Sequence, residues 1–433
     1  MPRPVQLRLF TDRDELQTEP EDWTFNGAPT RELTHCYHDY PARMIPQVAG
    51  KLLDLFGVGA TLLFDPYCGT GTSLVEGLVR GINAVGTDLN PLARLIAQAK
   101  TSTPDIRAVD RHITRLNRFV LQWKPLPSFE WPTIRGISRL DFWFKPEVIE
   151  KLSCLRAFIE EIEDELTRLF FWVAFSETVR ESSNTRSGEF KLYRYSPQEL
   201  ERFNPDVFGI MASKLQRNRE GLREFLAIMQ NFNHPPRATI CDFNTVVGVP
   251  HDQVASASVD IVVTSPPYGD SRTTVAYGQY SRLSAAWLGL PDADSIDRKL
   301  MGGESAKEIR RFPSDALNLA ISQVQEADEK RALEVSSFYS DLYDSIAHVS
   351  SLIKPGGYAC YVVGNRKVKG VILPTSIAIR DFFEHFGFEH IETFQRRIPN
   401  KRMPLRNSPT NVAGVLDHTM TREHIVVMRR KAT

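Results

Sequence analysis

The chain has 433 residues, 42% of them hydrophobic and 24% charged, a balance that is typical of globular proteins. Because this length exceeds the size at which a single core usually stops growing, we expect two domains or one domain with a large insertion. Lys and Arg number 53, as do Asp and Glu, which excludes a global basic field, so a polyanionic partner would have to be held by local patches.

The cysteines and the hydropathy exclude further classes of protein. The five cysteines show no C-x-x-C spacing, so neither a disulfide framework nor a zinc site is indicated. His35, Cys36 and His38 lie close together, but no second ligand cluster accompanies them, and we predict no metal. Since no signal peptide and no apolar run of membrane-spanning length occurs, we expect a cytoplasmic protein without membrane contact.

The first regular element is expected after an irregular, proline-containing arm that ends at about residue 34. Val48, Leu52, Leu53 and Phe56 then recur at helical spacing. This spacing predicts an amphipathic helix that packs on a sheet.

The next stretch predicts a strand, a glycine turn and a helix that bind a nucleoside cofactor. Gly69 and Gly71 allow the backbone to approach a ligand closely, and the following helix directs its N-terminus at that ligand. A second strand, residues 83–87, ends at Asp88, where such units carry the acid that binds a ribose hydroxyl pair. Asp65 opens the turn, and an anion there suits a cofactor with cationic sulfonium and ammonium groups.

Residues 101–236 carry long helical patterns, over 148–169 and 205–232, whose apolar positions we expect in a core. The polar loop between them contains Arg186 and Lys191, side chains suited to contacts with phosphates and base edges. A solvated loop explains the same composition equally well.

A buried strand over residues 259–263 leads into Ser265, Pro266, Pro267 and Tyr268. Such a turn is expected at the carboxyl end of a central strand, where open α/β sheets bind their ligands. The Ser265 hydroxyl and the Pro266 carbonyl are two acceptors beside an aromatic ring, which is what is needed to hold a planar amine. A proline-rich turn after an ordinary strand is the alternative.

The polar stretch after this turn is expected to contact nucleic acid through Arg272, Thr273, Gln279 and Arg282. A charged helical excursion over residues 291–334 follows. The remaining elements are predicted as a helix over 338–353, a turn over 354–357, strands over 358–363, 390–397 and 424–429, and a helix over 375–386.

Residues 391–408 form a basic segment between the last two predicted strands, with a single acid, Glu392. This charge predicts that the segment binds DNA phosphates electrostatically; a solvated hairpin loop is the alternative. Its five basic residues are Arg396, Arg397, Lys401, Arg402 and Arg406.

Four motifs in this order resemble the S-adenosylmethionine-dependent amino-DNA methyltransferases: Tyr-Pro-Ala-Arg-Met-Ile-Pro, Asp-Pro-Tyr-Cys-Gly-Thr-Gly-Thr, Gly-Thr-Asp-Leu-Asn-Pro-Leu-Ala and Thr-Ser-Pro-Pro-Tyr-Gly. The Ser-Pro-Pro-Tyr form resembles the cytosine-N4 branch, whereas Asp-Pro-Pro-Tyr is more usual for adenine-N6. The resemblance covers about residues 35–100 and 237–430.

This resemblance implies an α/β fold with a Rossmann-like, seven-stranded methyltransferase sheet and a largely helical insertion. Residues 1–100 would hold an arm and the first half of the catalytic domain, and residues 237–433 its second half. Residues 101–236 would be the insertion and the candidate for recognition of the DNA target.

Carried over by position, the resemblance also implies the site residues. Asp65 and the glycines would surround the methionine moiety, Asp88 would bind the ribose, Asp242 the adenine amino group, and Phe243 would lie against its ring. The full set expected to bind S-adenosylmethionine is Tyr40, Pro41, Asp65, Tyr67, Cys68, Gly69, Gly71, Thr72, Asp88, Leu89, Asp242 and Phe243. The catalytic set is Ser265, Pro266, Pro267 and Tyr268, and Tyr268 would stack on a flipped base, its ring mattering more than its hydroxyl.

The expected partner is double-stranded DNA, with a companion restriction endonuclease and a monomer or weak dimer as further expectations. Adenine-N6 methylation, RNA base methylation and a non-catalytic DNA-binding remnant of the fold stay open as alternatives. Cytosine-C5 methylation is excluded because it needs an activated thiolate, typically one that follows proline, and no cysteine here follows a proline.

Overall fold

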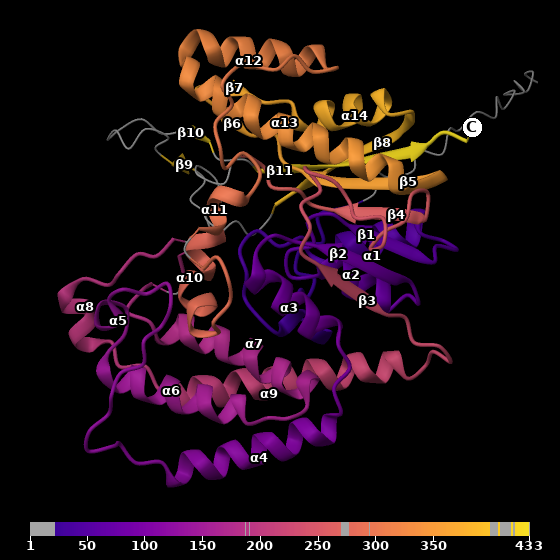
Figure 1. The fold of residues 1–433 in the computed structure, drawn as a ribbon. Helices are drawn as coiled ribbons and strands as arrows, with labels where there is room; N and C mark the ends of the chain where they lie inside the picture. Colours follow the sequence, from indigo (N-terminus) through magenta and orange to yellow (C-terminus); the bar gives the residue numbers. More distant parts are fainter. Residues whose placement is uncertain are drawn as a thin grey trace, which may run out of the picture.

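A seven-stranded mixed β-sheet forms the centre of the protein (Figure 1). The computed structural model describes residues 22–186, 188–189, 191–269, 277–293, 295–398, 406–407, 417–418 and 421–432. The strand order is β3-β2-β1-β4-β5-β11-β8, and β11 runs antiparallel to both of its neighbours. These strands are β1 (Leu62–Asp65), β2 (Asn83–Thr87), β3 (Ala238–Cys241), β4 (Val259–Thr264), β5 (Ile353–Val363), β8 (Phe388–Arg397) and β11 (Arg422–Arg430). The expected α/β fold with a Rossmann-like seven-stranded sheet is thereby confirmed.

The central strands are covered by helices on both faces. Val262 of β4 packs with α12 (Asp315–Ala327), α13 (Glu329–Leu352) and α14 (Thr375–His385) on one face. On the other face, Ile261 and Val263 pack with α1 (Pro46–Phe56) and α2 (Thr72–Leu78). Because both faces of β4 are buried, its last four residues, Ile-Val-Val-Thr over 261–264, are all β-branched and do not alternate with polar residues.

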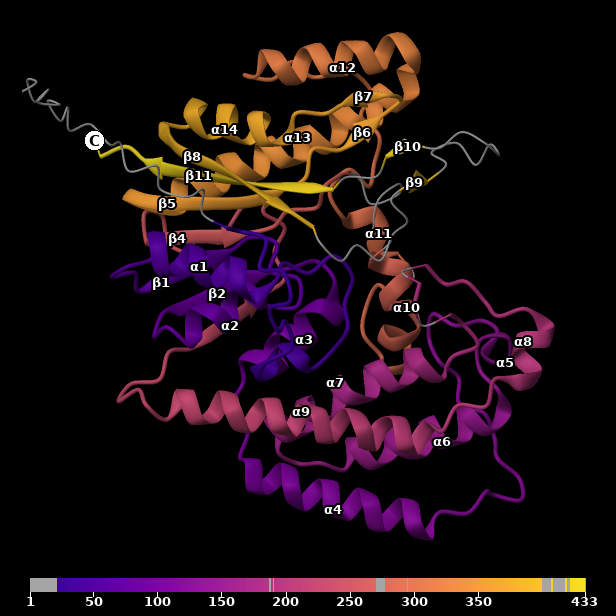
Figure 2. The same ribbon diagram turned by 180° about the vertical axis from the view of Figure 1, so that it is seen from behind.

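A layer of helices lies between α3 (Pro91–Thr101) and β3 in the sequence and beside the sheet in space (Figures 1 and 2). The turn over residues 265–268, named the catalytic turn for the role that the sequence predicts for it, is followed along the chain by α10 (Tyr277–Trp287), whose Trp287 packs edge-on against Phe144 and Phe175 of this layer. Helix α10 is thus anchored to this layer. The helices of the layer are α4 (Ile106–Gln122), α5 (Leu140–Trp143), α6 (Pro146–Glu160), α7 (Glu165–Ser182), α8 (Pro197–Arg202) and α9 (Val207–Met229).

Buried polar contacts fasten this layer to the N-terminal segment. Glu177 of α7 is 2% exposed, accepts a 2.6 Å hydrogen bond from Arg217 of α9, and accepts a 3.1 Å bond from the Asp39 backbone N–H. Gly221 of α9 allows a close crossing, since a Cβ there would lie 2.2 Å from the carbonyl oxygen of Leu33. The 3₁₀ helix η1 (Leu33–Cys36) and the residues after it therefore have a fixed position next to the sheet.

The helical pattern predicted over 148–169 is two helices, α6 and α7, separated at residues 161–164. A new helix begins after Asp164, because its carboxylate accepts a hydrogen bond from the Thr167 N–H at 2.7 Å and caps the N-terminus of α7. Leu166, expected in the core, is 39% exposed. The apolar spacing runs on past the break, which is why the sequence pattern missed it.

Two boundaries near β5 also differ from the prediction. Helix α13 begins at Glu329 and not at residue 338, because Asp328 accepts from the Arg331 N–H at 3.0 Å and supplies an N-cap. The turn expected over 354–357 belongs to β5 as a local irregularity, where the register with β4 shifts and Gly356 has φ +80°.

The charged segment over 291–334 contains the short helix α11 (Ile296–Lys299) before α12. Two small antiparallel ladders complete the structure: β6 (Lys367–Val368) with β7 (Val371–Ile372), and β9 (Arg406–Asn407) with β10 (Asp417–His418). In the part of the chain that the structure describes, every helix is too short or too polar to cross a membrane.

Candidate active site

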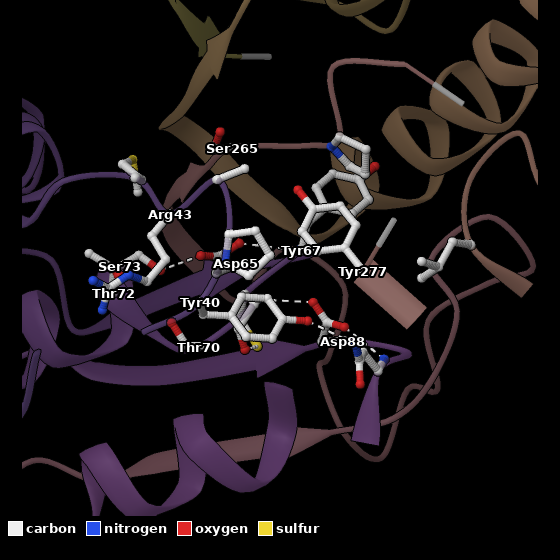
Figure 3. A pocket seen from close by; sticks show the side chains of 18 residues that line it. Tyr40, Arg43, Asp65, Tyr67, Thr70, Thr72, Ser73, Asp88, Ser265 and Tyr277 are labelled. Atoms are coloured by element: carbon white, nitrogen blue, oxygen red, sulfur yellow. Dashed lines mark hydrogen bonds between the residues drawn. The ribbon is translucent and has the colours of Figure 1, made fainter. Parts of the chain in front are cut away.

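A pocket lies where the carboxyl ends of β1, β2 and β4 meet, and the acids that end β1 and β2 face it (Figure 3). Its empty volume is about 690 Å³, part of it open to solvent. The pocket is built from the Tyr-Pro-Ala-Arg-Met-Ile-Pro segment over residues 40–46, hereafter the N-terminal motif, together with the glycine turn, the end of β2, the catalytic turn and the start of α10.

Asp65, the last residue of β1, is buried at the base of the pocket. Its carboxylate accepts hydrogen bonds from the Ser73 hydroxyl, from Thr264 Oγ1 at 2.5 Å and from the Tyr67 N–H at 3.1 Å. Burial nevertheless raises the pKa of Asp65 to about 6, because loss of solvent outweighs these bonds. The site thus holds a carboxylate that a cationic ligand would favour.

Asp88 fixes the glycine turn from the end of β2. Its two carboxylate oxygens accept from the Gly69 N–H at 3.0 Å and from the Asn90 N–H at 2.8 Å. Gly69 has φ +49°, and a Cβ added there would meet no atom within 4 Å, so the turn leaves open space above its backbone. Burial raises the pKa of Asp88 although both N–H groups favour the carboxylate.

An aromatic wall closes one side of the pocket. Tyr40 and Tyr277 stack with their ring centroids 6.0 Å apart, and Tyr280 meets Tyr40 edge-on. The Asn90 side-chain amide donates to the Tyr40 hydroxyl and to Ser281 Oγ, each at 2.8 Å. The N-terminal motif and α10 therefore form one surface.

The catalytic turn follows β4, and Ser265 and Pro267 line the pocket. Tyr268 lies outside the lining, and its hydroxyl accepts from Ser265 Oγ at 3.2 Å and donates to Glu423 Oε1 at 2.8 Å. Glu423 in turn is paired with Arg396 at 2.6 Å. The turn is thus connected to β8 and β11 by polar side chains.

Most of the residues expected to bind the cofactor are brought together. The pocket is lined by Tyr40, Pro41, Asp65, Tyr67, Cys68, Gly69, Thr72 and Asp88. Of the others, Gly71 lies behind the turn at the start of α2, where a Cβ would come 3.0 Å from the Ala97 Cβ. Leu89, Asp242 and Phe243 are absent from the lining; the Asp242 side chain is 80% exposed, and the Phe243 ring faces Phe64 with centroids 6.3 Å apart.

The pocket also contains residues that the sequence did not single out. Thr70 and Ser73 belong to the glycine turn and Arg43 to the N-terminal motif, so the motifs themselves carried that signal. Tyr277 lies in a stretch expected to contact DNA, and Leu300 lies in the charged excursion, where no pattern pointed to the cofactor. Ala42, Met44 and Asn90 complete the missed set.

The residues expected to contact DNA are dispersed. Arg186 is paired with Glu199 at 3.2 Å, while Lys191, Gln279 and Arg397 are exposed and Arg282 is half-buried. The expectations for Arg272, Thr273, Lys401 and Arg402 lie outside the described residues, and for Arg406 only the strand assignment is described.

The histidines and cysteine near the N-terminus have structural partners. His35 Nε2 lies 2.9 Å from Glu76 Oε1, His38 Nδ1 lies 2.5 Å from the Asp39 carbonyl oxygen, and Cys36 Sγ lies 3.5 Å from the Arg217 carbonyl oxygen. Burial lowers the pKa of both histidines to about 4, so they are neutral at pH 7. No cluster of three or more His, Cys, Asp or Glu with metal-binding geometry occurs within the described ranges.

Comparison with known proteins gives one relative over nearly the whole chain. The type II methyltransferase M.MvaI of Kocuria varians is 41% identical over 423 residues, which cover 94% of this chain and 93% of the relative. The type II methyltransferase M.MjaII of Methanocaldococcus jannaschii is 37% identical over 96 residues, 21% of this chain and 18% of the relative. The rRNA methyltransferase aviRa of Streptomyces viridochromogenes aligns over 91% of this chain and 88% of its own, at 12% identity and a TM-score of 0.32, too low to support an argument. No protein-family model matches this chain.

Proposed function

The chain belongs to the type II DNA methyltransferases, which use S-adenosylmethionine, and from this premise we propose that it methylates the N4 amino group of a cytosine flipped out of duplex DNA. The observation that carries the proposal is the Ser265-Pro266-Pro267-Tyr268 turn at the carboxyl end of β4, with Ser265 at the edge of the pocket. A serine hydroxyl and a proline carbonyl side by side offer two hydrogen-bond acceptors, which supports an amine as the nucleophile.

The polar side chains that line the pocket suit S-adenosylmethionine. Asp65 and Asp88 make the pocket anionic, which suits a ligand with sulfonium and ammonium groups. The buried Thr70 hydroxyl has no hydrogen-bond partner among the described residues and is available to a ligand. When bound, S-adenosylmethionine supplies the electrophilic methyl group.

Each of the acids has a separate role in this proposal. Asp65 complements the positive charge of the methionine moiety, and Asp88 accepts from the ribose hydroxyls, since each carboxylate oxygen has a second lone pair beyond those used by Gly69 and Asn90. Tyr40 and Tyr277 supply an apolar wall that excludes water. Asp242 and Phe243 remain proposed contacts of the adenine ring from the end of β3.

The chemistry follows from the amine. The lone pair of cytosine N4 is delocalised into the ring, so the amine is a poor nucleophile. If Ser265 Oγ and the Pro266 carbonyl accept its two N–H groups, the pyramidal amine would be favoured and its lone pair would be free to form the N–C bond to the donated methyl group. The S–C bond of the donor would break in the same step, S-adenosylhomocysteine would leave, and the methylated amine would release one proton to solvent. Because the cationic charge of the donor is lost in the transition state, positioning and desolvation contribute more than a strong base.

Base flipping and target recognition complete the proposal. The amine can reach this pocket only if the cytosine leaves the helix, and Tyr268 is proposed to contact it there. The helices over residues 101–236 are proposed to read the target sequence. In Figures 1 and 2, α5 and α8 lie on the same side of the molecule as β9 and β10. A companion endonuclease would recognise the same sequence.

The test is identification of the methylated nucleoside. Duplex DNA is incubated with the enzyme and methyl-labelled S-adenosylmethionine, digested to nucleosides and analysed by mass spectrometry, with Ser265→Ala as the matched control. We expect labelled N4-methylcytosine that is absent with the control. N6-methyladenine as the sole product would keep the amine chemistry and overturn the base, and label found only in added RNA would overturn the substrate.

A further inference from the structure

Behind Ser265, three side chains form a hydrogen-bonded chain that leads out of the catalytic turn. Ser265 Oγ lies 3.2 Å from the Tyr268 hydroxyl, which lies 2.8 Å from Glu423 Oε1. Glu423 Oε2 accepts from Arg396 Nη1 at 2.6 Å. The chain therefore runs from the proposed catalytic hydroxyl to an ion pair on β8 and β11.

The ion pair is built into the sheet. Arg396 and Glu423 are direct cross-strand partners in the β8–β11 ladder. Their side chains are 7% and 13% exposed, so water contributes little to their solvation. A carboxylate this enclosed that is also paired with a guanidinium is held in one orientation, and as an anion it can only accept hydrogen bonds.

The negative charge of Glu423 decides which group donates in each hydrogen bond between Ser265, Tyr268 and Glu423. An ionised carboxylate can only accept, so the Tyr268 hydroxyl must use its single proton to donate to Glu423. With that proton engaged, the Tyr268 oxygen can only accept from Ser265, which must therefore point its own proton away from the pocket. The face of Ser265 Oγ that remains offers lone pairs.

We propose that Glu423, through the Tyr268 hydroxyl, is a positioning residue that holds Ser265 as an obligate acceptor for the target amine. This inference rests on the proposed function, in which Ser265 accepts an amine N–H. A free serine hydroxyl can also donate, and a proton donated to the amine nitrogen would occupy the lone pair that must attack. Glu423 removes this unproductive orientation before substrate binds, and Arg396 keeps Glu423 in place.

The proposal gives the Tyr268 hydroxyl a role that differs from the expectation drawn from the sequence, where only the ring mattered. Tyr268→Phe keeps the ring but leaves Ser265 free to rotate. Glu423→Gln has a sharper effect: the carbonyl oxygen of glutamine satisfies Arg396, its amide donates to Tyr268, and Tyr268 then donates to Ser265. The chain is reversed, and the Ser265 proton is directed into the pocket.

The experiment is a double-mutant cycle on the full-length enzyme. Single-turnover methyl transfer, KM for duplex DNA and Kd for S-adenosylmethionine are measured for Glu423→Gln, Tyr268→Phe, Ser265→Ala and both combinations with Ser265→Ala. We expect the rate to fall about 10- to 100-fold in Glu423→Gln and Tyr268→Phe, the effect of losing one charge-assisted hydrogen bond, with KM and Kd unchanged. In the Ser265→Ala background, neither substitution should lower the rate further, because both act only through Ser265.

A matched control separates positioning from structural damage. Tyr339 is also a buried tyrosine whose hydroxyl has one side-chain partner, Thr375 Oγ1 at 2.8 Å, and it lies outside the pocket lining. Tyr339→Phe should lower the thermal midpoint but leave the rate of methyl transfer unchanged. If it slows transfer as much as Tyr268→Phe does, the effect of Tyr268→Phe is structural and the positioning role is overturned.

The outcomes distinguish this inference from the proposed function. A full rate in folded Glu423→Gln, or a further tenfold loss when it is added to Ser265→Ala, overturns the role of Glu423 while the proposed function stands. A full rate in Ser265→Ala overturns both. A non-additive cycle with N6-methyladenine as the product supports the positioning role and overturns only the choice of base.

Discussion

Tyr40 and Tyr277 stack in the wall of the pocket, with ring centroids 6.0 Å apart and an angle of 21° between the rings, although the whole helical layer separates them in sequence. Tyr40 belongs to the N-terminal motif and Tyr277 begins α10. Their contact joins the segment before the sheet to the segment after the catalytic turn, and both line the pocket.

This stack predicts that Tyr277→Ala weakens S-adenosylmethionine binding. An aromatic pair contributes about 0.5–1.5 kcal/mol beyond its buried area, so we expect Kd to rise by about 2- to 13-fold if the bound state depends on the stack. Calorimetric titration measures the change. Tyr277→Phe, which preserves the ring, should bind nearly as wild type; equal losses in both variants would assign the effect to the hydroxyl instead.

Because Asp65 is a buried carboxylate, we predict that Asp65→Asn is more stable than wild type at pH 8 but binds the cofactor less well. Its folded-state pKa of about 6 lies above the unfolded value of about 3.9, so its contribution to stability is full below pH 4 and is lost as pH rises through 6. At pH 8 the ionised, buried carboxylate therefore destabilises the cofactor-free fold. We expect Asp65→Asn to raise the free energy of unfolding by about 1–3 kcal/mol at pH 8, and this gain to disappear between pH 6 and 4.

Urea denaturation of wild type and Asp65→Asn at pH 8 and pH 5 measures this difference. The same variant should bind S-adenosylmethionine more weakly at pH 8, because the cationic ligand loses its counter-charge. A variant that is less stable than wild type at pH 8 would show that the hydrogen bonds from Ser73 and Thr264 outweigh the cost of burial.

The two other acids that are proposed to bind the cofactor, Asp88 and Asp242, are predicted to differ in importance. Asp88 is half-buried and faces the pocket, whereas the Asp242 side chain is 80% exposed and lies 4.0 Å from Arg94. Asp88→Ala should weaken S-adenosylmethionine binding by about 1.5–3 kcal/mol, the value of a charged hydrogen bond. Asp242→Ala should cost about 1 kcal/mol or less, because water already competes for its carboxylate.

Calorimetry on folded proteins compares the two variants. Asp88→Ala also leaves the N–H groups of Gly69 and Asn90 without their acceptor, so Asp88→Asn, which keeps one oxygen, serves as its control. Unchanged affinity in Asp88→Ala would remove Asp88 from the cofactor site.

A pair of like charges at the end of the sheet predicts a DNA contact. Arg397 and Arg422 are exposed and directly opposite each other in the β8–β11 ladder. Like charges in this position destabilise a sheet, so a bound phosphate would relieve them. Neutralising either one to Gln should reduce the slope of log affinity against log salt by about 0.9 for each DNA phosphate that the variant no longer binds, without lowering stability.

Equilibrium binding to duplex DNA over a range of salt concentrations measures the slope. Arg111→Gln is the matched control, because Arg111 is also exposed but lies on α4, at the edge of the helical layer away from the sheet (Figure 1). If all three variants keep the wild-type slope, the end of β8 faces away from DNA.

Local sequence patterns were enough to predict the base of the pocket. Asp65, Asp88 and Ser265 each come at or directly after the end of a strand, and the strands themselves are marked by β-branched and apolar runs. Because the carboxyl ends of neighbouring parallel strands meet at one edge of a sheet, three local motifs place these residues together. The bounds of β2 and the start of α14 were predicted for the same reason, since local pattern and turn residues agree there.

The distant side chains that complete the site are set by the packing of the folded chain. Tyr277 lies in a polar stretch whose composition is typical of a nucleic-acid contact, yet its ring stacks on Tyr40 in the pocket wall. No local sequence pattern distinguishes Glu423 from other charged residues near the start of a strand. Its hydrogen bond with Tyr268 forms because β11 lies antiparallel between β5 and β8. Sequence periodicity reports which face of an element is buried, but it does not report what that face meets. Contacts between segments far apart in the chain are fixed by sheet order and helix packing, which no local pattern contains.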